Sequence, residues 1–177
     1  VTTSAFTISP ALMKNLPYDP VRDLMPITKA VAAPNLMVVH PSVPVKSVKE
    51  LSAYAKAAAA KGTPMFYGSG GSGTNGHLAT ALFCSMADIK MTHVSYKSGA
   101  LAVVGMLSGE VPMMTDTMSS LWPHVQDGKL RAIGVSSLRP AAAAPGVPPI
   151  ADTVPGYESE QWYGLFAPAG TPQDVVT

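Results

Sequence analysis

A glycine-rich stretch behind a short apolar run is the part of this chain whose residue types could bind a ligand directly. Residues 65–77 read MFYGSGGSGTNGH, and a helical apolar pattern begins at Leu78. Glycine allows sharp turns and close approach of a bound atom, and the free N–H groups of a helix start attract an anion. The pattern predicts a strand, a loop and a helix. A small anion, a nucleotide and a purely structural turn are the interpretations it leaves open.

The candidate ligand contacts are the polar and glycine residues of this loop. An anion would lie against the backbone N–H groups between Ser72 and Asn75, assisted by the hydroxyl of Ser69 or Thr74. His77, in the first turn of the helix, either holds the loop by a hydrogen bond or touches the ligand. The predicted ligand-binding residues of the loop and helix start are Ser69, Gly70, Ser72, Gly73, Thr74, Asn75 and His77.

The same glycines also match a dinucleotide-binding fingerprint. Residues 68–73 fit G-x-G-x-x-G, with a strand before and a helix after. The fingerprint requires an acidic residue near the end of the next strand for the ribose hydroxyl. That strand ends instead with Tyr96 and Lys97, and a lysine can serve a 2′-phosphate. The alternative function is therefore an NADP-dependent oxidoreductase; a P-loop fits less well, because Thr74 follows Gly73 where its lysine should stand.

The remaining reactive residues form no catalytic set. Asp116 follows a strand and precedes a helix, so it either accepts an N–H or O–H of a ligand or caps the helix. Two helical turns separate His77 from Cys84, too far for the hydrogen bond that activates a thiol. His93 and His124 show no metal-ligand spacing and are interpreted as structural or surface residues. We therefore expect no enzyme activity, no metal and no cofactor.

Composition narrows the class of protein. Of 177 residues, 47% are hydrophobic and 13% charged, which is typical of a globular chain and not of a disordered one. The net charge is +1 and no two basic residues are adjacent, which argues against nucleic acid or a membrane surface as partner. No apolar stretch reaches the length of a membrane span.

Strand and helix patterns alternate along the chain and predict a parallel α/β sheet. A serine three residues before a glutamate, Ser47 and Glu50, predicts a capping box. Residues 139–155 are rich in alanine and proline and predict a surface connection. The expected strands are 36–40, 65–67, 91–96, 111–115, 130–135 and a last one from 165, and the expected helical patterns are 48–61, 78–86, 101–108 and 121–127.

Several motifs, in this order, carry a family resemblance. They are PYDPVRD at 17–23, the glycine loop with His77, HVSYK at 93–97, GKLRA at 128–132, PGYE at 155–158 and APAGTP at 167–172. Together they make the chain similar to the Bug family, the periplasmic solute receptors of tripartite tricarboxylate transporters.

The resemblance implies a type II periplasmic-binding-protein fold that holds a small carboxylate for membrane permease subunits. Residues 30–133 would form a complete second domain with the ligand loop at 68–74, and residues 1–29 and 134–177 would be pieces of the first domain. Tyr96 would then flank the cleft, next to Ser95 and Ser98 where the family often has proline and glycine. Residues 115–117 read TDT where the family often reads FDN, so the identity of the ligand does not transfer.

The two ends of the chain suggest a longer protein. Residues 1–4 read like the end of a strand, and Thr171 with Pro172 predicts a helix that has just begun, with Thr171 as its cap. We expect a fragment with an incomplete first domain and hence exposed apolar surface and strand edges, and this exposure should make the fragment self-associate.

Overall fold

The computed structural model describes residues 2–176, whose contacts group into two compact units. The central unit is Pro34–Glu160, and the terminal unit combines the residues up to Ala33 with those from Gln161. The second boundary differs from the expected break after residue 133. The reason is burial: Val135, Ile150 and Tyr157 all lie in the core of the central unit.

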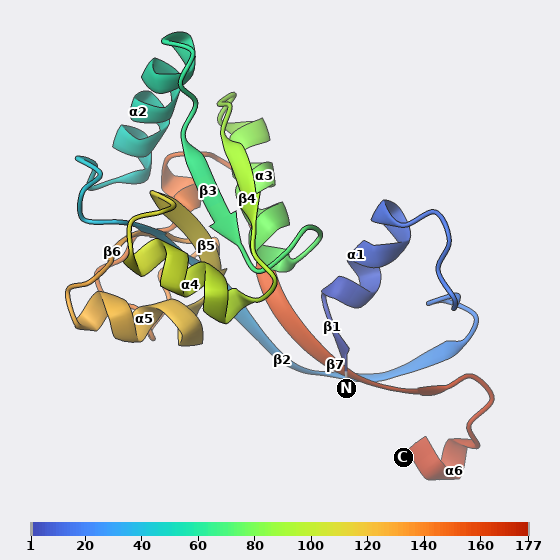
Figure 1. The fold of residues 1–177 in the computed structure, drawn as a ribbon. Helices are drawn as coiled ribbons and strands as arrows, with labels where there is room; N and C mark the ends of the chain where they lie inside the picture. Colours follow the sequence, from blue (N-terminus) through green and yellow to red (C-terminus); the bar gives the residue numbers. More distant parts are fainter. Residues whose placement is uncertain (1, 177) are drawn as a thin grey trace. The chain divides into compact units, whose positions relative to one another are not determined.

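The central unit is built on a mixed sheet with strand order β6–β2–β5–β3–β4 (Figure 1). Its strands are β2 (Leu24–Val39), β3 (Phe66–Ser69), β4 (Thr92–Ser95), β5 (Met113–Thr117) and β6 (Arg131–Val135). β3 runs parallel to β4 and β5, as predicted, whereas β2 is antiparallel to both β5 and β6. The expected all-parallel sheet is therefore wrong for β2. Strand direction depends on where the chain enters the sheet, and no local pattern records that.

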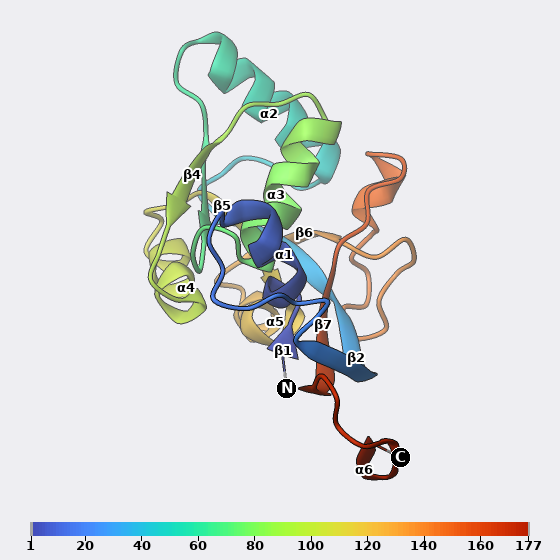
Figure 2. The same cartoon turned by 90° about the vertical axis from the view of Figure 1, so that its right-hand side faces the viewer.

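Helices cover both faces of this sheet (Figure 1; Figure 2). They are α2 (Val48–Ala60), α3 (Asn75–Met86), α4 (Gly99–Leu107) and α5 (Met118–Gln126). The predicted capping box is confirmed: Ser47 Oγ accepts from the N–H of Glu50, and Glu50 Oε2 accepts from the N–H of Lys46. All four expected helices are present, with boundaries close to those predicted.

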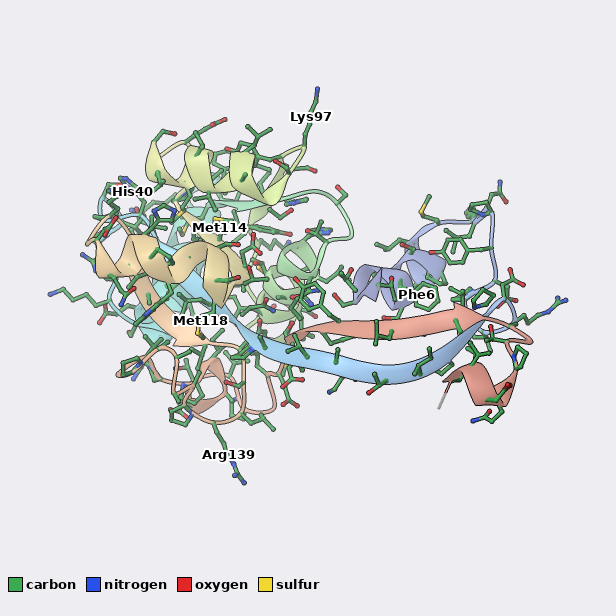
Figure 3. The ribbon with its side chains drawn as sticks, turned by 90° about the horizontal axis from the view of Figure 1, so that it is seen from below. Phe6, His40, Lys97, Met114, Met118 and Arg139 are labelled. Carbon is green, nitrogen blue, oxygen red and sulfur yellow. The ribbon has the colours of Figure 1, made fainter. Side chains whose placement is uncertain are left out.

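Two apolar cores lie on the two faces of the sheet. Successive β2 residues alternate between them: Met37 and Val39 pack with α2 and α3, and Leu36 and Val38 pack with α4 and α5. Figure 3 labels Met114 and Met118, which belong to the second core. Much of this apolar volume is methionine: Met37, Met106, Met113 and Met114 have no exposed surface.

Residues 139–155 are not the surface connection that was expected. Ala144, Val147 and Ile150 are buried, and a short 3-10 turn, η1 (Ile150–Asp152), follows. The N–H of Val135 donates to the carbonyl of Pro148, and Val135 also bridges to Pro149. The segment therefore covers the outer edge of β6, a role that small apolar residues and prolines allow.

The terminal unit contains β1 (Thr2–Thr3), α1 (Ala5–Leu12), the first half of β2, β7 (Glu160–Pro168) and α6 (Gln173–Val176). β1 pairs antiparallel with β7, and Phe6 packs on Phe166 with ring centroids 5.0 Å apart. The helix after Pro172 is present, but it begins at Gln173, and the hydroxyl of Thr171 donates to the carbonyl of Pro168. Among the described residues, no helix is long and apolar enough to cross a membrane.

Candidate ligand-binding site

Three helices of the central unit begin just after the three parallel strands. α3 follows β3, α4 follows β4 and α5 follows β5. Glycines bring these starts together: a Cβ at Gly70 would lie 2.6 Å from the nitrogen of Gly99, and one at Gly76 would overlap the carbonyl oxygen of Thr115. The glycine loop, α4 and the end of β5 therefore meet at the carboxyl edge of the sheet, where open α/β folds bind ligands.

The loop between β3 and α3 is held by its own hydrogen bonds. Gly71 and Gly73 have φ values of +142° and +80°, a backbone region that favours glycine. Thr74 caps α3: its hydroxyl donates to the carbonyl of Gly71 at 2.8 Å and accepts from the N–H of His77 at 3.5 Å. The cap satisfies one of the unpaired donors at the helix start.

The amides of the loop divide into occupied and open donors. The N–H of Gly73 donates to His77 Nδ1 at 3.0 Å, and that of Thr74 donates to the carbonyl of Gly71 at 3.3 Å. Ser72, Asn75 and Gly76 have no acceptor for their N–H groups within the described part of the chain. The unpaired donors are thus these three amides, of which Gly76 is buried against β5, and not the continuous row from Ser72 to Asn75 that the sequence suggested.

Ser69 stabilises the loop from below. It is 1% exposed, and its hydroxyl donates to the carbonyl of Gly71 at 3.0 Å and accepts from the N–H of the same residue at 3.2 Å. The third partner of Ser69 Oγ is Nε2 of His93, at 2.6 Å. This hydroxyl is fully occupied inside the protein, so its role in the structure is to fix Gly71.

His77 takes the first of its two predicted roles and holds the loop. Its Nδ1 accepts from Gly73, and its ring stacks on that of His93 with centroids 4.0 Å apart. His93 stacks in turn on Tyr67, its register partner across β3 and β4. Burial lowers the pKa of His77 and, with the neighbouring His77 ring, that of His93. His93 is a structural residue, as the sequence suggested, but its link to the loop could not be predicted, because the strand register that places it is not a local signal.

Asn75 joins the helix start to a buried polar network. Its Nδ2 donates to the carbonyl of Glu160 at 3.0 Å, and its Oδ1 accepts from Nδ2 of Asn35 at 2.5 Å. Asn35 is fully buried in β2, and its N–H donates to the hydroxyl of Ser136. Asn35 was not predicted from the sequence; the available signal was an amide directly before the apolar run 36–39.

Tyr96 and Asp116 lie on two sides of α4. A Cβ at Gly105 would lie 2.6 Å from Cζ of Tyr96 and one at Gly68 would lie 3.5 Å from its Cε2, so this ring packs between α4 and the end of β3. Asp116 Oδ1 accepts from the N–H of Thr117 at 2.7 Å, and its Oδ2 would lie 3.4 Å from a Cβ at Gly99. Burial raises the pKa of the Asp116 carboxyl. The carboxyl group therefore sits at the start of α4, where it can accept an N–H or O–H.

Reactive side chains elsewhere do not assemble into a second centre. The Cys84 thiol packs against the first core, and burial raises its pKa to about 11, which disfavours the nucleophilic thiolate. Among residues 2–176, no three His, Cys, Asp or Glu side chains are grouped so as to hold a metal ion.

The fold is that of periplasmic solute-binding proteins, and comparison with known proteins shows the family. The chain matches the tripartite tricarboxylate transporter family receptor over residues 1–177 and belongs to that family. It is 33% identical, over 99% of its length, to a UPF0065 protein from the tcbD-tcbE intergenic region of Pseudomonas sp. strain P51, and covers 52% of that protein. It is 26% identical to the protein BugT of Bordetella pertussis, of which it covers 53%.

Comparison with solved structures leads to the same family. Rpa4515 of R. palustris, determined with adipate, matches with a TM-score of 0.88 at 32% identity, over 99% of this chain and 58% of that one. The periplasmic binding protein BugD matches with a TM-score of 0.87 at 28% identity, over 98% and 57%. MatC of Rhodopseudomonas palustris, with bound malate, matches with a TM-score of 0.82 at 25% identity, over 96% and 57%. The chain thus spans little more than half the length of these proteins.

Proposed function

We propose that this protein is an extracytoplasmic solute receptor that captures a small carboxylate. It would deliver the ligand to the membrane permease subunits of a tripartite tricarboxylate-type transporter, act in the periplasm and catalyse no reaction. Family membership supports this proposal, as do the adipate and malate in Rpa4515 and MatC. We interpret the central unit as the second domain of such a receptor and the terminal unit as part of the first.

One observation supports carboxylate capture above the others: the unpaired amides of Ser72 and Asn75 at the start of α3, with that of the buried Gly76 behind them. The helix dipole favours an anion there by about 0.3–1 kcal/mol. Each N–H bond to a charged group adds about 1.5–3 kcal/mol. No lysine or arginine is needed for such a site, which agrees with the low charge of the loop.

The other predicted site residues take supporting roles in this proposal. Gly70 and Gly73 give the ligand access to the backbone, and Ser69, Thr74 and His77 fix the loop. The site also includes three residues outside the loop core: Asn75 as a link to β2, Asp116 as an acceptor for a ligand N–H or O–H, and Tyr96 as the packing support of α4.

A ligand panel tests the proposal against the alternative of an NADP-dependent oxidoreductase. Thermal unfolding is measured with adipate, malate, a monocarboxylate and NADPH, and hits are confirmed by calorimetry. A receptor gains stability with a carboxylate and none with NADPH. The alternative requires a cation for the 2′-phosphate, and Lys97 is exposed and extends away from the central unit (Figure 3). A shift with NADPH alone would overturn the receptor proposal.

A further inference from the structure

Three stacked rings lie beneath the glycine loop and are bonded to it at two points. Tyr67, His93 and His77 come from β3, β4 and α3, with centroid distances of 5.0 Å between the first two and 4.0 Å between the histidines. His77 bonds to Gly73, and His93 bonds to Ser69. The rings therefore support both ends of the loop from one side.

The hydrogen bonds define where each ring carries its proton. His77 Nδ1 accepts the N–H of Gly73, so this nitrogen has a free lone pair. His93 Nε2 lies 2.6 Å from Ser69 Oγ, and because the single hydroxyl proton of Ser69 is directed to Gly71, we assign the hydrogen of this bond to His93 Nε2. A proton added to His77 Nδ1 would point at the N–H of Gly73 and break that bond. A proton added to His93 would leave its bond to Ser69 intact.

The groups around the pair favour neutral histidines. Tyr67 and Cys84 have pKa values of about 12 and about 11, raised by burial, and stay uncharged at neutral pH. On the other sides of α3, the hydroxyl of Tyr157 donates to the carbonyl of Ala79, and Asp116 is directed to the start of α4. Burial lowers the pKa of both histidines, and the positive charge that matters to His93 is that of His77.

We propose that His77 and His93 are positioning residues that hold the glycine loop in its anion-binding conformation, and that protonation of His77 releases Gly73 and weakens capture. The inference rests on the proposed function for its effect on affinity, but the loop change itself needs no ligand. Gly73, at φ +80°, is held at its amide by this one bond among the described residues. Capture should therefore decline as the pH falls below about 6.5, the ordinary value for histidine.

The first experiment follows the protein by NMR without ligand, from pH 7.5 to pH 5. We expect the amide resonance of Gly73 to shift with the same midpoint as the His77 ring, and that midpoint to lie below the ordinary value for histidine, because burial lowers the pKa of His77. In His77→Asn, Oδ1 replaces Nδ1 as acceptor and cannot be protonated, so the Gly73 resonance should not titrate. A Gly73 resonance that ignores the His77 titration, or still titrates in His77→Asn, overturns the proposal.

The second experiment measures affinity for adipate and malate at pH 7.5 and pH 5.5. One competing proton weakens binding by up to about tenfold per pH unit below its pKa, so we expect weaker binding at pH 5.5 than at pH 7.5. His77→Leu should weaken binding at both pH values, and His77→Asn should restore it with no pH response beyond that of the ligand itself. His93→Gln, which keeps the Nε2 donor, should retain the response, as should the control His40→Asn.

The two proposals fail differently. If neither these acids nor other carboxylates bind at pH 7.5, the receptor function fails and the NMR titration still decides the loop inference. If adipate or malate binds at pH 7.5 but wild type and His77→Asn lose affinity equally at pH 5.5, the receptor function stands and the role of His77 is overturned.

Discussion

The close approach of Gly70 to α4 gives the sharpest prediction of the effect of a substitution. In Gly70→Ala, the new Cβ would lie 2.6 Å from the nitrogen and 2.9 Å from the Cα of Gly99. Ordinary contacts between such atoms are about 3.5 Å, so the loop or the start of α4 must move by about 0.9 Å. The neighbours are backbone atoms, which cannot rotate away as a side chain does. Overpacking of this kind costs about 1–3 kcal/mol.

Urea denaturation followed by far-UV circular dichroism measures this cost. The midpoint temperature of thermal unfolding should fall by about 2–12 °C, given about 2–4 °C per kcal/mol for a chain of this size. Gly99→Ala is the matched control, because its Cβ would meet only Asp116 Oδ2, at 3.4 Å. Alanine is also the better helix former, by up to about 1 kcal/mol. If the free energy of unfolding of Gly70→Ala lies within about 0.5 kcal/mol of the wild-type value, the loop does not pack on α4 as described.

Three further predictions concern the site and its support. Gly73→Val places a β-branched residue at φ +80°. The affinity for adipate or malate, measured by calorimetry, should therefore fall by at least about tenfold while the circular dichroism spectrum stays native. Unchanged affinity would show that the loop is not the binding site. Asp116→Asn should raise the urea midpoint at pH 7, because burial raises the pKa of the Asp116 carboxyl and so penalises its ionised form. The gain should vanish near pH 3.5, where the carboxyl is protonated in both the folded and the unfolded chain. An equal gain at both pH values would contradict this. Tyr157→Phe keeps the ring but loses the 3.0 Å bond to the carbonyl of Ala79, so unfolding should cost about 0.5–1.5 kcal/mol less, and no change in urea would refute that role.

The strand, loop and helix around residues 66–86 were predictable because each boundary has a local chemical cause. Thr74 caps α3 with its own side chain, and Gly71 and Gly73 adopt the backbone angles that glycine favours. The capping box at Ser47 and Glu50 is equally local. Such signals need only a few neighbouring residues, so the sequence alone suffices.

Features that depend on distant partners could not be predicted. β2 is 16 residues long, but residues 26–32 are exposed and show no alternation, so only its buried end, from Leu36, was recognised. The support of the loop by His93 depends on the register of β3 with β4, and the link from Asn75 to Asn35 joins residues 40 positions apart.

The methionine-rich core also divides the sulfur atoms of this protein into two classes of chemical reactivity. Peroxide converts methionine to its polar sulfoxide only where it reaches the sulfur. Met13 and Met86 are 54% and 40% exposed and should oxidise first, whereas Met37, Met113 and Met114 have no exposed surface. A sulfoxide at Met37 or Met114 would introduce a polar group into one of the two cores, so its appearance in a mass spectrum reports that the sheet has opened. Oxidation of the buried methionines therefore distinguishes molecules that have unfolded from molecules that have stayed folded.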